Sequence, residues 1–361
     1  MNDGRMFQGI GSPRPGSSAV CITAASFLLT GLTFGQTNTP SRGDSAPLEE
    51  IVVSATKRAE SVQDVPVAVT ALSGEMLKDL GLPDAMAVAS QTPNLYAESP
   101  YGRMAPRFNL RGVGTNDYTS TTVSAVGVYF DDVFINSNIG QGVPIFDLDR
   151  VEVLRGPQGT LWGKNTIGGA INFVSRRPAS EFDGYGRITL GNYESRELEA
   201  AMGGPITGDT LLGRVAFVTA RRDGQFYNAT LGRSEGGYED TAARAQLLWR
   251  PTDNLEALLI LSTRDLDQSL NMRHVGILPG GVDINGFSSR ANSDVVSMDR
   301  ENEIGVHSRN VTLNVNWEGP SGITWTSISS FNDVESVSIQ DDEASPIGIE
   351  DSFIGTSVDQ L

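Results

Sequence analysis

Residues 156–166 read GPQGTLWGKNT, and glycines beside a lysine could cradle a phosphate group. A phosphate-binding loop needs a glycine, four residues, and then Gly-Lys followed by Ser or Thr. Here only three residues separate Gly159 from Gly163, and an asparagine follows Lys164. The next residues, GGAINFVS, alternate like a strand, where a phosphate loop would open a helix. The run therefore predicts a structural role and no nucleotide site.

The chain offers few other side chains for catalysis or metal binding. It has two histidines, His274 and His307, and a single cysteine, Cys21. A structural zinc site needs four ligands, usually Cys and His. A lipase-type nucleophile needs a base beside it, and the two histidines lie in loop-like or strand-end settings. We therefore expect no catalytic residue, no metal, no cofactor and no enzyme activity.

The charge balance argues against nucleic acid as a partner. The 361 residues include 44 acidic and 27 basic side chains, for a net charge of −17. Such a chain repels a phosphate backbone. The sequence predicts neither nucleotide nor nucleic-acid binding.

The N-terminus has the composition of an export signal. Arg5 and Arg14 precede the apolar run AVCITAASFLLTGLTFG, which ends in small residues. A charged segment, an apolar segment and a small-residue cleavage point are typical of a secretory signal peptide, which we place at residues 1–35. The run is too short for a transmembrane helix, which needs about 20 apolar residues.

From about Tyr185 onward, apolar and polar residues alternate as they do in β-strands. In RNVTLNVNWEG, for example, Val311, Leu313 and Trp317 fall on one face of an extended chain. A period of two predicts strands. We count about seven strands as far as Gln340, and the start of an eighth at Ser357.

The connections between these strands alternate between short and long. Tight turns are expected at residues 204–210, 250–254 and 318–322, whereas a connection on the other side runs from 267 to 306. Short turns at one end and long loops at the other are typical of a transmembrane β-barrel.

The positions of the tryptophans also favour a transmembrane β-barrel over a soluble β-sandwich. Trp249, Trp317 and Trp325 lie near the short turns, at the level of a membrane-interface girdle. A sandwich more often buries its tryptophan in mid-strand. Seven or eight strands would leave a sheet edge facing lipid, so the sequence looks truncated.

The residues before this region combine strands with short helices. Ser73 can cap a helix over GEMLKDL, and Pro83 can start another over PDAMAVASQ. Strand candidates are VPVAVTAL, FNLRGVG, VGVYFDDVFI, VEVLRG and GGAINFVS. Together they predict a compact α+β domain of about 120 residues.

Four motifs in a fixed order carry a family resemblance. They are EEIVVSATKR, FNLRGVG, VYFDDVF and FDLDRVEVLRGPQGTLWGKNTIGGAINFVSRRP. From Glu49 to Pro178 the chain resembles the plug domain of TonB-dependent outer-membrane receptors, and it continues into barrel-like strands. The resemblance implies an α+β plug domain followed by an incomplete antiparallel transmembrane β-barrel, with about 22 strands in a complete protein. The implied parts are a signal peptide (1–35), a flexible N-terminal segment (36–56), the plug (57–178) and the first seven to eight barrel strands (182–361).

The resemblance also implies a TonB box, the segment that such receptors offer to the periplasmic domain of TonB. It consists of Glu50, Ile51, Val52, Val53, Ser54 and Ala55. An extended, unpaired, β-prone segment could add an edge strand to that partner. The alternative is that these residues are simply the first strand of the plug.

Further site residues follow from the family's pattern. Arg111, Glu152 and Arg155 are expected to be buried plug charges paired with the barrel wall, since an unpaired buried charge is costly. Residues at outward-facing plug tips could meet a ligand or could belong to solvated loops. They are Tyr101, Arg103, Arg107, Asn116, Tyr118 and Asn138.

The function implied by the resemblance is TonB-dependent transport of a scarce nutrient across the bacterial outer membrane, foremost an iron–siderophore complex. The expected partners are TonB, outer-membrane lipids and a ferric siderophore. Alternatives are a receptor for cobalamin, a sugar or an aromatic compound, and a non-functional truncated remnant. An outer-membrane enzyme is disfavoured because both histidines lie in loop-like or strand-end settings, and a passive pore is disfavoured by the plug.

Overall fold

The computed structural model describes residues 52–58, 60–82, 84–115, 117, 122–270, 294–341, 348 and 351–361. The chain divides into two units, Met1–Leu48 and Glu49–Leu361, and every described residue belongs to the second.

A five-stranded sheet forms the centre of the plug. Its order is β3 (Val69–Ser73), β8 (Leu148–Arg155), β9 (Gly169–Ser175), β6 (Val126–Phe130) and β7 (Val133–Phe134). Only β6 and β9 run parallel. Alternate residues of these strands, among them Val128, Val151 and Ile171, pack with Leu72 and Phe108 in one buried core. The alternating apolar motifs thus fold into a sheet with a buried face.

The hairpin between β6 and β7 depends on two aspartates. Phe130 pairs with Val133, so Asp131 and Asp132 alone form the loop, with φ angles of 48° and 68°. Two-residue hairpins favour this left-handed pair because its twist matches that of the strands. The Asp131 carboxylate also accepts hydrogen bonds from the backbone N–H and the hydroxyl of Ser175, at 2.7 Å each.

Short helices cover the plug sheet. α1 (Gly74–Asp79) begins as predicted at Ser73, whose hydroxyl accepts from the Met76 N–H at 3.2 Å. The second predicted helix is a 3-10 helix, η1 (Ala85–Gln91), capped by Asp84. The remaining short elements are η2 (Asn138–Gln141), α2 (Gly159–Trp162) and the strand pairs β1 (Val52–Val53) with β2 (Glu60–Ser61) and β4 (Leu95–Glu98) with β5 (Arg107–Leu110).

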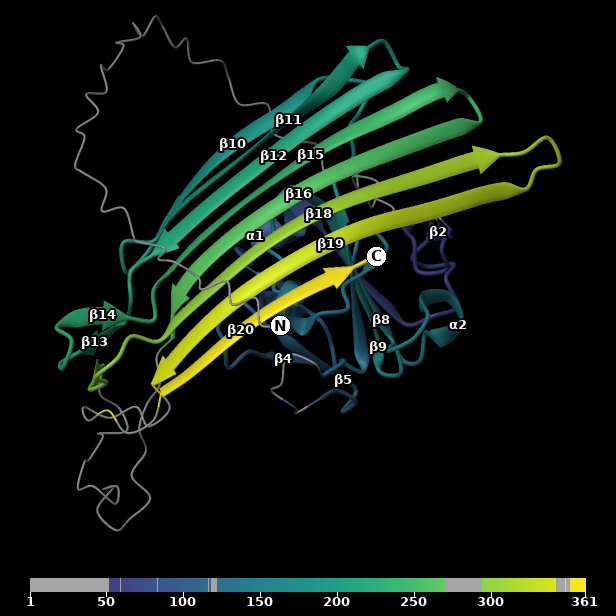
Figure 1. Cartoon of the computed structure of the whole chain (residues 1–361). Coiled ribbons are helices and arrows are strands. Elements are labelled where there is room, and N and C mark those ends of the chain that lie inside the picture. The colour runs from purple at the N-terminus through teal and green to yellow at the C-terminus, as the bar shows by residue number, and fades with distance from the viewer. Residues whose placement is uncertain are drawn as a thin grey trace, which may run out of the picture. The chain divides into compact units, whose positions relative to one another are not determined.

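The second half of the chain forms an eight-stranded antiparallel sheet, here called the wall. Its strands, in order, are β10 (Asp183–Leu190), β11 (Arg196–Thr207), β12 (Leu211–Arg222), β15 (Tyr238–Thr252), β16 (Leu255–Ser269), β18 (Glu303–Glu318), β19 (Thr324–Asp341) and β20 (Asp351–Gln360). Figure 1 shows them side by side as one curved sheet. The eighth strand begins at Asp351, earlier than Ser357, because all ten of its residues pair with β19.

The two ends of the wall differ in their connections. Short turns join β11 to β12, β15 to β16 and β18 to β19 at one end, the turn end. The longer connections lie at the opposite end, the loop end, where β13 (Phe226–Asn228), β14 (Arg233–Glu235) and β17 (Val295–Val296) form a small separate sheet. The predicted short turns are therefore real turns between wall strands.

The wall has an apolar outer face, and its inner face carries buried polar and charged side chains beside an apolar cluster of Leu212, Leu248, Leu258 and Ile260. On β15, Leu247 and Trp249 are exposed, whereas Arg244 and Gln246 are buried against the plug. On β18, Val311 and Leu313 are exposed and Thr312 between them is buried. This inverted alternation is that of a barrel with lipid outside and a filled lumen. Among the described residues, no helix combines the length and apolar character needed to cross a bilayer.

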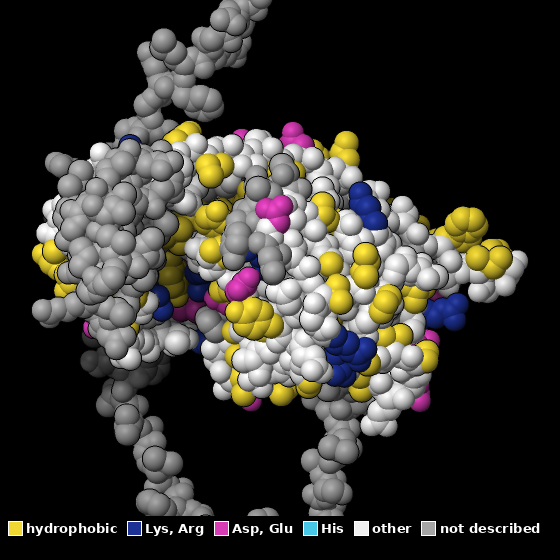
Figure 2. All heavy atoms as spheres, turned by 90° about the horizontal axis from the view of Figure 1, so that it is seen from below, with side chains coloured by type: hydrophobic (Ala, Val, Ile, Leu, Met, Phe, Trp, Pro, Cys, Tyr) yellow, Lys and Arg dark blue, Asp and Glu magenta, His cyan; other side chains and the backbone are white. Residues whose placement is uncertain are grey.

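Charged side chains are dispersed on the face shown in Figure 2, where the Lys and Arg groups stand apart instead of forming one basic patch. This arrangement agrees with the acidic composition.

Candidate functional site

The N-terminal segment is folded onto the plug. β1 pairs with β2 in a short antiparallel hairpin, in which Val52 lies opposite Ser61 and Val53 opposite Glu60. Val53 and Ala55 have no exposed surface, while Val52 is 45% exposed. The expectation of an unpaired segment therefore differs from the structure over its described part, because a local hairpin satisfies the backbone. Glu50 and Ile51 lie outside the described residues.

A buried carboxylate holds the next residue of the segment. The backbone N–H of Ser54 donates to Glu152 Oε1 at 2.8 Å, and the Ser54 hydroxyl donates at 3.1 Å. Glu152 is fully buried and also accepts from Arg150 Nε at 2.7 Å. Burial alone would lower the pKa of Arg150, but the charge of Glu152 and hydrogen bonds to Glu152 and Asp149 raise it overall. The pair is thus charged and compensated.

Trp162 holds the segment from the other side. Its indole N–H donates to the Ala55 carbonyl at 2.9 Å. Lys57 Nζ lies 3.4 Å from the centre of the same ring and 2.9 Å from Asp132 Oδ1. Tyr129 packs edge-on to Trp162 and donates its hydroxyl to the Trp162 carbonyl, and burial raises the pKa of Tyr129 to about 12. We call the contacts of Ser54, Ala55 and Lys57 with Glu152, Trp162 and Asp132 the clasp.

The glycine-rich run positions Trp162. It makes the single helical turn α2 and then reverses at Gly163, whose φ is 79°. Farther on, Gly169 has a φ of 150°, and a Cβ there would lie 2.2 Å from the Leu154 carbonyl oxygen. Lys164 is exposed. The run is therefore plug structure that seats the N-terminal segment.

The plug meets the wall through a buried charge cluster around Asp147. Its carboxylate accepts from Arg214 Nε at 2.7 Å and from Arg214 Nη2 at 2.5 Å. Arg244 donates to the carbonyls of Phe146 and Asp147 at 3.0 and 2.8 Å, and the Asp147 N–H donates to Glu199 at 3.0 Å. The side chains of Asp147 and Arg214 are each 1% exposed. Three wall strands thus converge on one plug residue.

A second charge cluster surrounds Arg103. Its Nε donates to Asp240 Oδ2 at 3.1 Å, and Arg264 donates to both oxygens of Asp240 at 2.9 Å. The carbonyl of Gly142 accepts from Arg264, and the Arg103 N–H donates to Gln268 at 3.0 Å. Buried charges of both signs are compensated, as a low-dielectric interior requires.

Comparison with known proteins agrees with this architecture. The profile of the TonB-dependent Receptor Plug Domain matches residues 61–170. Through this plug domain the chain is similar to the TonB-dependent receptors. The pesticin receptor of Yersinia enterocolitica is 28% identical over 258 residues, which cover 71% of this chain and 37% of that protein. The ferripyoverdine receptor of Pseudomonas aeruginosa is 24% identical over 181 residues, 49% of this chain and 21% of that protein.

A solved structure shows the same fold. The ferric yersiniabactin uptake receptor FyuA from Yersinia pestis superimposes with a TM-score of 0.66 at 24% identity, over 76% of this chain and 42% of that one. The predicted fold class, a plug followed by antiparallel barrel strands, is confirmed. The chain spans about a third of the length of the pesticin receptors that it matches.

The charges that join the plug to the wall differ from those expected. Glu152 contacts Ser54 and Arg150, both in the plug, because its side chain faces the clasp. Arg111 is exposed at a turn with a φ of 53°, and Arg155 is half-buried. Among the described contacts, none joins these three residues to the wall. Sequence reasoning missed Asp147, whose one distinguishing local feature is a strand start beside it.

The residues predicted to meet a ligand lie in different settings. Arg103 is a plug–wall contact, and Arg107 and Asn138 are buried at 2% and 8% exposure, so these side chains are enclosed. Tyr101 is half-buried, and its carbonyl accepts from Gln268 at 2.6 Å. Asn116 and Tyr118 lie outside the described residues, as does His274.

A pocket at the loop end of the receptor was not expected from the sequence. It has a volume of about 600 Å³ and lies between Gly102 of the plug and the wall residues Tyr193, Arg222 and Tyr238. The guanidinium groups of Arg103 and Arg222 lie 4.5 and 5.4 Å from the centre of the Tyr238 ring. Arginines and tyrosines at strand ends were its only sequence signal. Among the described residues, no group of acidic or histidine side chains could hold a metal ion.

Proposed function

We propose that the protein imports an iron–siderophore complex across the bacterial outer membrane, driven by TonB. One observation carries the proposal. The plug is hydrogen-bonded to the inner face of a wall whose outer face is apolar, and the same plug holds the predicted TonB box in the clasp. Ferripyoverdine and ferric yersiniabactin receptors are among the similar proteins, which supports iron chelates as the ligand class.

Strand β8 offers a physical link between the wall and the box. Asp147, the centre of one plug–wall cluster, immediately precedes β8, and Glu152 within β8 accepts from Ser54. A paired strand moves as a rigid element, so a shift of the plug at Asp147 would displace the Glu152 carboxylate. The box would then leave the clasp and could add a strand to TonB.

The pocket at the loop end is the proposed first contact for the ligand. Arg222 and Tyr238 supply a cation and an aromatic face there, and Asp240 and Asp84 partly offset the charge of Arg103. Such a pocket suits an anionic, oxygen-rich chelate, which can accept hydrogen bonds and stack.

Uptake of radioiron tests the function. Cells that express the receptor from its own gene receive iron chelated by yersiniabactin, pyoverdine or ferrioxamine B, with and without functional TonB. We expect uptake of at least one chelate with TonB, and binding without uptake when TonB is missing. Uptake that does not depend on TonB, or no uptake of any chelate, would contradict the proposal.

Site-specific crosslinking tests the box. The described residues contain no cysteine, and Val52 is exposed, so Val52→Cys can be paired with cysteines along the TonB periplasmic domain. Ser61→Cys, on the opposite strand of the hairpin, is the matched control. We expect ligand-dependent disulfides from position 52 and none from position 61. No disulfide from position 52 in the presence of ligand would count against the box assignment.

A further inference from the structure

The plug is bonded to the wall unevenly. In the plug, Asp147 bonds to β12 and β15, and Arg103 bonds to β15 and β16. On β20, Gln360 accepts from the Asn136 N–H and donates to the Phe134 carbonyl of the plug. Between the described residues of the plug and those of β18 or β19, there is no hydrogen bond or ion pair. The plug touches this strand pair through apolar contact, with Ile139 packed in a cluster that includes Val334.

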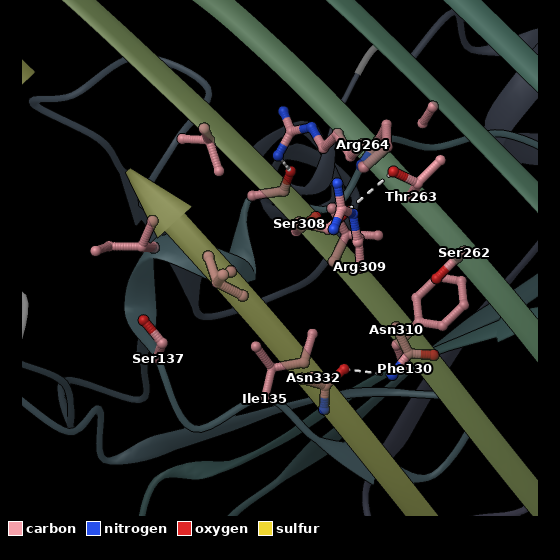
Figure 3. A pocket seen from close by; sticks show the side chains of 18 of the residues that line it. Phe130, Ile135, Ser137, Ser262, Thr263, Arg264, Ser308, Arg309, Asn310 and Asn332 are labelled. Carbon is pink, nitrogen blue, oxygen red and sulfur yellow. Dashed lines mark hydrogen bonds between the residues drawn. The ribbon is translucent and has the colours of Figure 1, made fainter. Parts of the chain in front are cut away.

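A cavity lies between the plug and β18 and β19, and two arginines of β15 and β16 that bond the plug also line it. Its volume is about 120 Å³, and it separates the apolar plug residues Phe130 and Ile135 from the wall residues Ser308, Asn310 and Asn332. Figure 3 shows Asn310 and Asn332 hydrogen-bonded to each other beside Phe130 and Ile135. A space of this size with polar groups on one side can hold several water molecules.

From this cavity, uncharged polar side chains continue toward the turn end. Asn310 and Thr312 on β18 bond to Ser330 on β19 at 3.0 Å each, and Thr326 donates to Asn316 at 2.7 Å. We call Asn310, Thr312, Asn316, Thr326, Ser330 and Asn332 the neutral ladder. Apart from the apolar Ile328, the inward positions between Asn310 and Thr326 carry amides or hydroxyls and no charge.

The rest of the inner wall is different. Arg214, Arg244 and Arg264 project from β12, β15 and β16 and are occupied by plug groups. Moving the plug away from these strands would expose several buried charges, which is costly. Moving it away from β18 and β19 would break no hydrogen bond or ion pair between the described residues, and it would widen a space that is already present.

We propose that β18 and β19 form the wall of the passage by which the ligand moves past the plug. The inference rests on the proposed transport function and adds its route. The neutral ladder offers many weak hydrogen-bonding sites and no fixed charge, so an oxygen-rich chelate could bind and leave in steps, as conduction requires. The plug would stay bonded to β12, β15 and β16 while it separates from β19.

Two tethers in the receptor, expressed from its own gene, test the route. Gly140→Cys with Val334→Cys joins the plug to β19, because a Cβ at position 140 would lie 3.6 Å from Val334. Ser175→Cys with Gln246→Cys joins it to β15, where the two side chains bond at 2.6 Å. The same short thiol crosslinker is applied to both pairs. Radioiron uptake before and after crosslinking is compared, using whichever of the three chelates the unmodified receptor transports.

We expect the β19 tether to abolish uptake without loss of chelate binding, and the β15 tether to preserve uptake. Uptake through the β19 tether, or loss of uptake with both tethers, would overturn the proposed route. If the unmodified receptor transports none of the chelates, the transport function itself fails, and the route with it.

Adjacent serines on β19 provide a second, independent test. Ser330→Val removes a hydroxyl from the neutral ladder, whereas Ser329→Val makes the same change on the exposed outer face. We expect Ser330→Val to lower the maximal rate of uptake several-fold with little change in chelate binding, and Ser329→Val to leave both unchanged. Equal rates in the two variants would contradict a role of the ladder in passage.

Discussion

Single residues join parts of this chain that are far apart in sequence. Trp162 reaches Ala55 across 107 positions, Arg214 reaches Asp147 across 67, and Arg103 reaches Asp240 across 137. The sequence marked Trp162 only as part of a glycine-rich run and Asp147 only as part of a longer motif, because nothing within a few residues encodes a distant partner. Glu152 is buried within the plug, whereas the wall contacts are made by Asp147 and Arg103.

Trp162→Phe should loosen the box. The change removes the indole N–H that donates to Ala55 and keeps an aromatic ring for packing. Loss of one such hydrogen bond corresponds to about 1 kcal/mol, or roughly a fivefold rise in the released fraction. A spin label at Val52→Cys reports that fraction as a mobile spectral component. Leu161→Ala, at an exposed neighbour, is the control and should give the parent spectrum.

Asp147→Asn should weaken the joint between plug and wall. It removes the carboxylate charge that the buried Arg214 and Arg244 share and leaves Arg214 with Asp183 alone, at a cost of about 3 to 5 kcal/mol. The urea concentration at which the plug becomes protease-sensitive in the membrane-embedded receptor measures this loss. Asp149→Asn, at a residue 51% exposed, should lower the free energy of unfolding by less than about 1 kcal/mol and so shift the urea midpoint little. Equal shifts for the two variants would refute a special role of Asp147.

Elements were easier to predict than their contacts. Ser73 marked the start of α1, and alternating residues marked the plug and wall strands, because capping and period two are local properties. The helix at residues 85–91 is of the 3-10 type; Asp84 caps its first turn, and the Thr92 hydroxyl bonds back to the Val88 carbonyl just before Pro93. The pairing of β1 with β2 could not be read from so short a segment.

Two glycines near the turn α2 should respond in opposite ways. Gly169→Ala combines a left-handed φ with a collision against the Leu154 carbonyl, and should cost about 2 to 4 kcal/mol. Gly159→Ala has open space around it and should be neutral or stabilise slightly. Urea midpoints of plug protease protection distinguish them. Similar destabilisation by both would mean that the run is constrained by something other than its backbone.

At the scale of the whole molecule, the side chains on each face of the wall match the surroundings of that face. The outer positions of β18 are apolar toward the turn end, while inner positions bind the plug or form the neutral ladder. The sequence predicted this alternation, and it predicted short connections at one end of the wall and long connections at the other. It could not predict which strands bond the plug, since that depends on how the plug sits against the wall.

Charge on the two faces of β18 should have unequal effects. Leu313→Arg places a cation among exposed apolar side chains and should destabilise the membrane-inserted receptor by about 2 to 4 kcal/mol if it lies near mid-bilayer. Asn314→Arg faces the polar interior and should be tolerated. Folding into lipid vesicles at graded urea concentrations compares them. A larger cost for the inner variant would reverse our assignment of the two faces.

The geometry of β1 and β2 determines how this chain would respond to a mechanical load. Val52 and Ser61 lie at the open end of the hairpin, so a pull on the residues before Val52 would act on one backbone pair at a time. After the hairpin opens, the same pull would reach the Ser54–Glu152 and Ala55–Trp162 bonds in turn. Bonds loaded in sequence yield at lower force than bonds sheared together. The first resistance to such a pull would therefore be small, and the force would rise only when it reaches β3, the edge strand of the plug sheet.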